Sequence, residues 1–151
     1  MNFKGMAVHE YSIAEGIVST IKKLKDANNL ISISEAVIQI GSLAQIDRNV
    51  LLDLLSILSE EYGLGKVNYI IKYEESSFEC NQCGFTWSWS HVKESIMGEL
   101  CGELKDCDNP VHFIPDLINV FMKCLRCGSQ DFKIVSGYDV RLISVKGVRN
   151  D

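Results

Sequence analysis

The chain has 151 residues, 46% of them apolar, which is enough for one domain or two small ones with a buried core. Twenty acidic against fifteen basic side chains give a net charge of −5, which argues against nucleic acid or an anionic membrane as the main partner. No stretch approaches about 18 consecutive apolar residues, and residues 1–20 lack the apolar run of a signal peptide. We therefore expect a cytoplasmic protein.

Two segments have the apolar periodicity of amphipathic helices. The first predicts a helix over residues 10–27 that ends near Asn28 and Asn29. Its apolar stripe consists of Ile13, Ile17, Val18, Ile21 and Leu24. The second helix follows Asp47, a residue type that caps helices, and ends at Gly63. Its apolar face consists of Val50, Leu51, Leu54, Leu55 and Leu58.

Strand-like segments alternate with these helices. Residues 35–40 are rich in β-branched side chains and end at Gly41, which predicts a strand. A second strand is expected over residues 67–74, with one face made of Val67, Tyr69, Ile71 and Tyr73. Residues 132–145 again alternate apolar and polar side chains, which predicts a further strand or hairpin. Between these segments, from about Ser76, the periodicity is interrupted.

The strongest signal is a pair of CxxCG motifs. Cys80 and Cys83 form the first pair, Cys124 and Cys127 form the second, and residues 84–123 lie between them. Two residues between cysteines let one tight turn direct both sulfur atoms at a common point, and a following glycine takes a positive φ easily. Two such turns predict a closed four-sulfur shell for structural zinc. Iron in the same shell, free thiols, a disulfide and a redox CxxC motif are the alternatives.

The cysteine pairs divide the chain into two parts. We predict an α+β fold in which a small sheet is packed by two helices and a zinc-ribbon-like domain is inserted between its strands. The helices and sheet occupy residues 1–76 and 133–151, and the zinc-binding domain occupies residues 77–132. Cys101 and Cys107 lie inside the insertion at a spacing unlike the CxxCG motifs, so we interpret them as partly buried thiols rather than a second metal site.

Three histidines are the other candidate metal ligands. His9 and Glu10 stand where the first helix begins, near free backbone N–H groups. The alternative interpretation is an exposed imidazole next to a carboxylate that interacts with the helix dipole. His91 follows an aromatic segment and either packs there or caps the next one. His112 lies in a stiff segment between Pro110 and Pro115, which either presents its imidazole as a ligand or packs it in the core or on the surface.

Together these features resemble the HypA/HybF family of hydrogenase maturation proteins over nearly the whole chain. The resemblance rests on His9-Glu10 before an amphipathic helix, residues 40–43 before a second helix, and the doubled CxxCG motif. The long insertion with residues 112–116 is similar to the archaeal branch. In the family the His-Glu pair directly follows the initiator methionine, whereas residues 1–8 precede His9 in this chain.

The resemblance implies a nickel metallochaperone rather than an enzyme. It implies that transferable Ni(II) binds near the N-terminus through the His9 imidazole and the backbone amides of His9 and Glu10, with His112 as an additional ligand. It also implies structural Zn(II) held by Cys80, Cys83, Cys124 and Cys127. The implied partners are a nucleotidase of the HypB or Mrp/MinD type and the [NiFe]-hydrogenase large subunit. We expect the protein to be a monomer or a domain-swapped dimer.

Two other classes of function compete with the metallochaperone. A zinc-ribbon interaction module would dock a partner protein, with His9 incidental. A thiol oxidoreductase would use one CxxC pair, which fits poorly because zinc-bound thiolates are withheld from exchange.

If translation begins at Met6 and that methionine is removed, Ala7 supplies an amine that completes a square-planar nitrogen set with His9.

Overall fold

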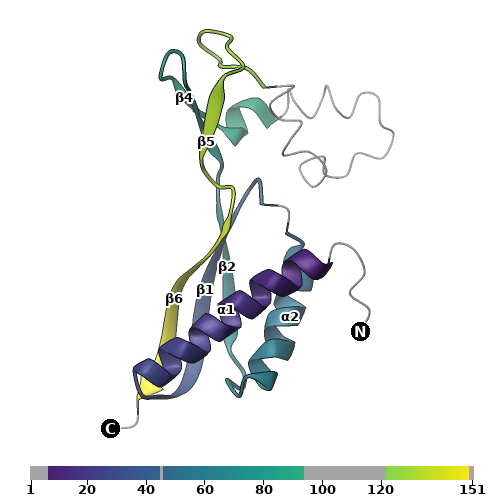
Figure 1. Cartoon of the computed structure of the whole chain (residues 1–151), viewed down its shortest axis with the longest axis vertical. Helices are drawn as coiled ribbons and strands as arrows, with labels where there is room; N and C mark the ends of the chain where they lie inside the picture. Colours follow the sequence, from purple (N-terminus) through teal and green to yellow (C-terminus); the bar gives the residue numbers. More distant parts are fainter. Residues whose placement is uncertain (1–6, 45, 94–121, 150–151) are drawn as a thin grey trace. The chain divides into compact units, whose positions relative to one another are not determined.

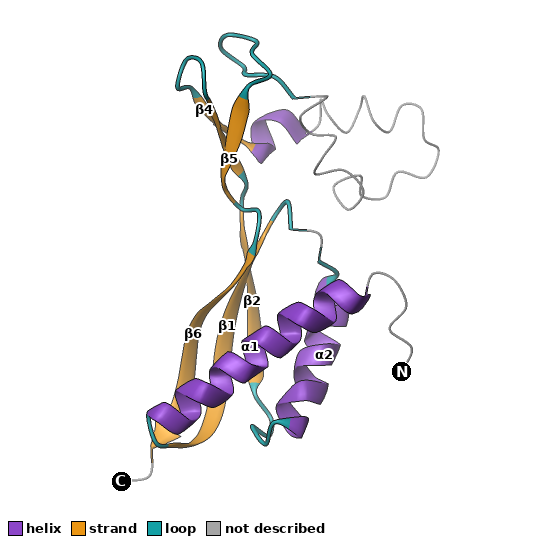
Figure 2. Ribbon diagram, viewed as in Figure 1, coloured by secondary structure: helices purple, strands orange, loops and turns teal. Residues whose placement is uncertain are grey.

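A computed structural model describes residues 7–44, 46–93 and 122–149, which form two compact units (Figure 1). The first unit contains residues 7–39, 46–72 and 140–149, and the second contains residues 40–44, 73–93 and 122–139. The elements, in chain order, are α1 (Ala7–Ala27), β1 (Leu30–Gly41), α2 (Arg48–Glu61), β2 (Asn68–Glu74), β3 (Ser77–Cys80), β4 (Thr86–Ser88), β5 (Phe132–Ser136) and β6 (Val140–Arg149). The predicted α+β class is confirmed (Figure 2).

The first unit is a three-stranded sheet with two helices. Its strand order is β2-β1-β6, and α1 packs against α2 and against β6. The buried stripe of α1 runs through Ala14, Ile17, Val18 and Ile21, which lie at steps of three and four residues. Leu24 was expected in this stripe, but its side chain is 40% exposed. The sequence pattern alone did not show that small Ala14, rather than Leu24, belongs to the buried face.

Helix α2 begins as the sequence predicted. The Asp47 side chain accepts hydrogen bonds from the backbone N–H groups of Asn49 and Val50, at 3.0 and 3.1 Å. It therefore satisfies two of the donors that a helix N-terminus leaves without an intrahelical partner. The buried side chains of α2 are Leu51, Leu54, Leu55, Leu58 and Ser59. Ser59 donates to the carbonyl oxygen of Leu55 and is hydrogen-bonded to the Tyr69 hydroxyl of β2.

The strands differ from the predictions in extent and in partners. β1 extends back to Leu30, beyond the predicted 35–40. Residues 31–34 alternate isoleucine and serine, a strand pattern that the prediction left out. Tyr73 was predicted on the same face as Tyr69, yet it is 62% exposed. Residues 132–145 were predicted as a further strand or a hairpin. They do contain strands, but the hairpin is wrong: β5 and β6 belong to different sheets, β5 next to β3 and β6 next to β1. Gly137, at φ +74°, lies between them.

The second unit is organised around the short antiparallel sheet β4-β3-β5. Phe78 of β3 is fully buried, and its ring lies 5.7 Å from Trp87 and 5.8 Å from Phe132, measured between centroids. The Trp87 indole N–H donates to the Met122 sulfur at 3.3 Å. Although the periodicity of the sequence is interrupted here, this part of the chain has an apolar cluster of its own. The cluster contains Leu43, Phe78, Cys80, Trp87, Trp89, Val92, Met122 and Cys124.

The second unit also extends beyond the residues predicted for the zinc-binding domain, 77–132. Three segments outside that range are joined by hydrogen bonds: Gly41 N–H donates to Asp139, Ser42 N–H to Glu74, and Leu43 N–H to Gly137, at 2.8–3.0 Å. The fully buried Ser76 hydroxyl donates to the Gly137 carbonyl oxygen at 2.7 Å. We call this cluster of residues 41–43, 74–76 and 137–139 the three-segment crossing.

The three-segment crossing requires glycine at two positions. A Cβ added to Gly41 would overlap the backbone of Gly137. A Cβ added to Gly137 would lie 2.5 Å from the Cα atom of Ser76, and Gly137 also has a positive φ of 74°. Because the neighbouring atoms are backbone rather than flexible side chains, little relaxation is available.

No helix among residues 7–44, 46–93 and 122–149 is long and apolar enough to cross a membrane.

We expect Gly137→Ala to destabilise the second unit by more than about 3 kcal/mol, because it adds backbone overlap to a left-handed dihedral. Gly84→Ala is the matched control: Gly84 has φ +76° and nothing within 4 Å of an added Cβ. It therefore tests the dihedral alone and is expected to cost about 1–2 kcal/mol. Chemical denaturation in excess zinc, followed by tryptophan fluorescence, measures both. Equal losses for the two variants would contradict the close packing.

Candidate functional site

The structure brings the four predicted cysteines together. All four Sγ atoms lie within 4.8 Å of one another, those of Cys80, Cys83, Cys124 and Cys127. The Sγ atoms of Cys80 and Cys127 are 3.5 Å apart, and those of Cys83 and Cys124 are 3.6 Å apart. A tetrahedral zinc ion with Zn–S bonds of about 2.3 Å requires sulfur atoms about 3.8 Å apart. The four residues therefore fit a tetrahedral metal ion.

The two cysteine turns have the same local geometry. In the first, the N–H groups of Gln82 and Cys83 donate to the Cys80 sulfur at 3.4 and 3.5 Å. In the second, the N–H groups of Arg126 and Cys127 donate to the Cys124 sulfur at the same two distances. Each turn ends at a glycine with φ near +75°, Gly84 and Gly128, whose N–H returns to the carbonyl oxygen of the turn's first cysteine. Each CxxCG motif thus directs backbone N–H groups at the first sulfur atom of its pair.

These hydrogen bonds change the acidity of the thiols. The backbone N–H of Cys83 lowers the pKa of Cys80, against the effect of burial. Burial opposes ionisation of Cys124, but hydrogen bonds from the backbone of Cys127 and Arg126 lower its pKa to about 6. At Cys127 the Ser129 backbone favours the thiolate, but the Cys80 side chain and burial outweigh it and raise the pKa to about 12. Four adjacent thiols do not all ionise unless a cation compensates their charge.

Polar side chains outside the motifs hold the first turn in place. Asp131 accepts hydrogen bonds from the side-chain amides of Asn81 and Gln82, at 2.9 and 3.4 Å. The Asp131 carbonyl oxygen also accepts a hydrogen bond from the Asn81 backbone N–H, and the Phe85 carbonyl oxygen accepts one from the Cys80 backbone N–H. No motif pointed to Asp131, because its partners lie about 50 positions earlier in the chain.

His9 and Glu10 lie in the first part of α1, but their side chains have different surroundings. His9 is exposed, whereas Glu10 is only 3% exposed. The Glu10 Oε1 atom accepts a hydrogen bond from the Asp47 backbone N–H at 3.1 Å. No sequence pattern predicted this contact, because the two residues lie 37 positions apart. We predicted that α1 begins at Glu10, whereas it begins three residues earlier, at Ala7.

The remaining candidates are placed only in part. His112, Cys101 and Cys107 lie outside the residues that the structure describes. His91 is exposed, and its Nδ1 atom accepts a hydrogen bond from the Ser88 backbone N–H at 3.2 Å. Of its two predicted roles, His91 therefore takes that of a local hydrogen-bonding cap.

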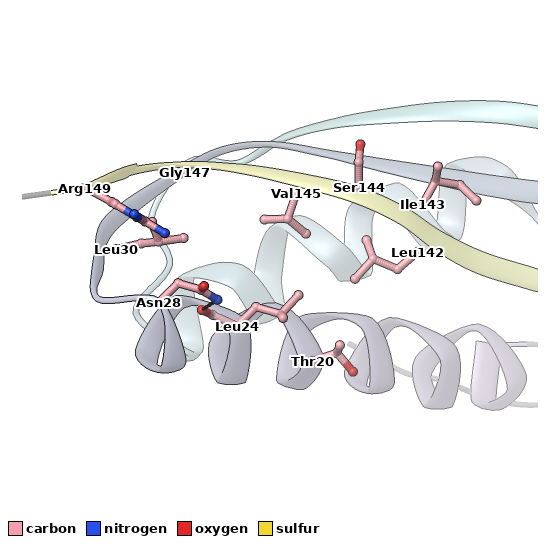
Figure 3. A pocket seen from close by; sticks show the side chains of 10 residues that line it. All are labelled: Thr20, Leu24, Asn28, Leu30, Leu142, Ile143, Ser144, Val145, Gly147 and Arg149. Carbon is pink, nitrogen blue, oxygen red and sulfur yellow. Dashed lines mark hydrogen bonds between the residues drawn. The ribbon is translucent and has the colours of Figure 1, made fainter.

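A surface pocket of about 540 Å³ lies between the C-terminal half of α1 and β6 (Figure 3). Its lining includes Leu24, Leu142 and Val145, together with Asn28 and Arg149. The lining residues include no histidine, cysteine or carboxylate. Thr20, the lining residue nearest His9 in the sequence, is about 16 Å further along the helix at 1.5 Å per residue. None of the candidate metal ligands among the described residues therefore lines this pocket.

Comparison with known proteins gives one consistent family. A family model described as "Hydrogenase/urease nickel incorporation, metallochaperone, hypA" matches residues 8–147. Hydrogenase maturation factor HypA of Pyrococcus horikoshii is 27% identical over 139 residues, which are 92% of this chain and 95% of the relative. The HypA of Thermococcus onnurineus is 29% identical over 143 residues, again 92% and 95%.

A solved structure has the same fold. The solution structure of the Ni metallochaperone HypA from Helicobacter pylori aligns with a TM-score of 0.59 and 18% identity, and covers 93% of this chain and 98% of that one. The family resemblance inferred from the sequence is thus confirmed. Because the family model matches nearly the whole chain, this protein belongs to the HypA family of nickel-incorporation metallochaperones.

Proposed function

We propose that this protein binds Ni(II) at His9 and delivers it to the large subunit of a [NiFe]-hydrogenase, while Zn(II) at Cys80, Cys83, Cys124 and Cys127 has a structural role. The family supplies the nickel and hydrogenase context. The two metals are assigned different roles because the two sites differ in geometry and exposure. Four sulfur atoms lie within 4.8 Å of one another, whereas His9 is exposed on the first turn of a helix.

The chemistry of each donor set matches its proposed metal. Zinc is commonly held in structural sites by four thiolates in a closed tetrahedral shell. Ni(II) favours square-planar sets of nitrogen donors, such as an imidazole and ionised backbone amides. The His9 N–H lies among the first donors of α1, which have no intrahelical acceptor, so it is available without loss of a helical hydrogen bond. We propose the Glu10 amide and the His112 imidazole as further donors.

Delivery requires a site that releases its metal. An exposed histidine at the start of a helix can exchange ligands with a partner protein, whereas a closed thiolate shell releases its ion only when the thiolates are protonated or the metal is chelated. We therefore propose a carrier without catalytic activity of its own. Its proposed partners are the hydrogenase large subunit and a nucleotidase of the HypB or Mrp/MinD type, which supplies the energy for transfer.

The nickel site is tested by His9→Ala, with His91→Ala as the matched control. His91 is also an exposed histidine, but its Nδ1 already accepts a hydrogen bond from Ser88. We expect His9→Ala to weaken Ni(II) binding by at least about tenfold and His91→Ala to leave it unchanged, measured by competition with a chromophoric chelator. Equal Ni(II) affinity in wild type and His9→Ala would contradict the proposed nickel site.

The zinc site is tested by Cys83→Ser, with Gln82→Ala as the control inside the same turn. We expect Cys83→Ser to lose stoichiometric zinc after dialysis against a weak chelator, because three thiolates leave an open coordination position. Gln82 contributes its backbone N–H rather than its side chain to the Cys80 sulfur, so Gln82→Ala is expected to retain zinc. Elemental analysis measures both, and loss of zinc from neither variant would contradict the assignment.

The two metals are expected to leave at different pH values. Nickel at His9 should dissociate first as pH falls, because protonation of the imidazole removes a nitrogen donor from an exposed site. Zinc should remain to lower pH, because a divalent ion in a closed shell compensates the charge of all four thiolates and so opposes their protonation. Metal analysis after dialysis at stepped pH gives both midpoints. Zinc loss at or above the nickel midpoint would contradict this order.

A further inference from the structure

Glu10 has a buried carboxylate whose bonding is incomplete. The residue is only 3% exposed, and its Oε1 atom accepts from the Asp47 N–H at 3.1 Å. Its Oε2 atom is buried and has no hydrogen-bond partner among the described residues. A buried acceptor that lacks a partner costs about 1–3 kcal/mol, so such groups call for an explanation other than stability.

The hydrogen bond joins two helix starts within the first unit. Glu10 belongs to the first part of α1, and Asp47 is the residue whose side chain caps α2. The Asp47 side chain holds the N–H groups of Asn49 and Val50, while its own N–H is held by Glu10. The beginning of α1 is therefore fixed to the capped beginning of α2, one residue away from His9.

We propose that Glu10 is a positioning residue for nickel: its carboxylate fixes the start of α1 to Asp47 and so determines where the neighbouring His9 presents its imidazole and backbone amide. This inference rests on the proposed function at His9. A carboxylate that is 97% removed from solvent and already accepts a backbone hydrogen bond is poorly placed to ligate an exchangeable ion beside an exposed imidazole. Side chains that orient a metal ligand commonly change metal affinity by about 10–100-fold when they are removed.

Two substitutions separate position from charge. Glu10→Gln keeps the chain length and an oxygen that can accept from the Asp47 N–H, but it removes the negative charge. Glu10→Asp keeps the negative charge, but it is one methylene shorter and cannot reach Asp47 from the same backbone position. A positioning role requires a side chain long enough to contact Asp47, which Glu10→Gln keeps. A role as nickel ligand or as a source of negative charge requires the carboxylate, which Glu10→Asp keeps.

The experiment measures Ni(II) affinity by chelator competition, the visible absorption of the nickel-loaded protein, and the thermal midpoint. It uses the full chain with zinc bound. We expect Glu10→Gln to bind Ni(II) within about threefold of wild type and Glu10→Asp to bind at least about tenfold more weakly. Both should show the wild-type nickel spectrum at saturation, because the set of ligating atoms is unchanged.

Ser59→Ala controls for stability within the same unit. It removes buried hydrogen bonds to Leu55 and Tyr69, about 18 Å along α2 from Asp47 at 1.5 Å per residue. It is expected to lower the thermal midpoint without weakening Ni(II) binding. If Ser59→Ala weakened nickel binding as much as Glu10→Asp does, general destabilisation would explain both results and the positioning role would be overturned.

Two other results would overturn the inference. Wild-type affinity in Glu10→Asp would show that the contact with Asp47 does not matter, and a weaker Glu10→Gln with an altered spectrum would identify the carboxylate as a ligand. His9→Ala, measured in parallel, separates this failure from failure of the proposed function. If His9→Ala loses nickel while Glu10→Asp does not, only the positioning role fails; if His9→Ala binds as wild type, both proposals fail.

Discussion

The convergence of four sulfur atoms is the constraint on which the second unit depends. Cys80 is the last residue of β3 and Cys124 precedes β5, and these two strands are neighbours in the sheet. Their pairing brings together two cysteine turns that lie far apart in the chain. Backbone N–H groups then lower the pKa of Cys80 and of Cys124, whereas that of Cys127 is raised to about 12. A divalent ion that compensates this charge therefore stabilises the fold around the site, since binding energy for the folded form is folding energy.

Apolar packing also holds the second unit together. Phe78, Trp87 and Phe132 pack beside the cysteine turns with ring centroids 5.6–5.8 Å apart. Cys80 and Cys124 are members of the same buried cluster as Trp87 and Met122. The sulfur shell is therefore closed on one side by an apolar core, which restricts the access of water and chelators to its two buried ligands. Such shielding suits an ion that is retained rather than transferred.

The sequence predicted what local patterns encode. Helical periodicity located α1 and α2, a side-chain oxygen before Arg48 located the start of α2, and the spacing of cysteines predicted the sulfur cluster. It failed where partners are distant. The different sheets of β5 and β6, the glycine overlap at Gly41 and Gly137, and the contact between Glu10 and Asp47 all depend on residues more than 30 positions apart. No single-chain pattern records such pairs, because either residue alone is compatible with many environments.

The contrast between His9 and Glu10 follows from helix geometry. Consecutive residues on an α-helix are rotated by about 100°, so one can face solvent while the next faces a packed neighbour. His9 is exposed, and Glu10 is buried against the start of α2. A metal carrier needs both properties at once: an imidazole that a partner can reach, and a backbone that holds the imidazole in one place. In the proposed nickel site, two adjacent residues meet both needs: the exposed imidazole of His9 can pass its metal to a partner, while the buried carboxylate of Glu10 keeps the helix start fixed.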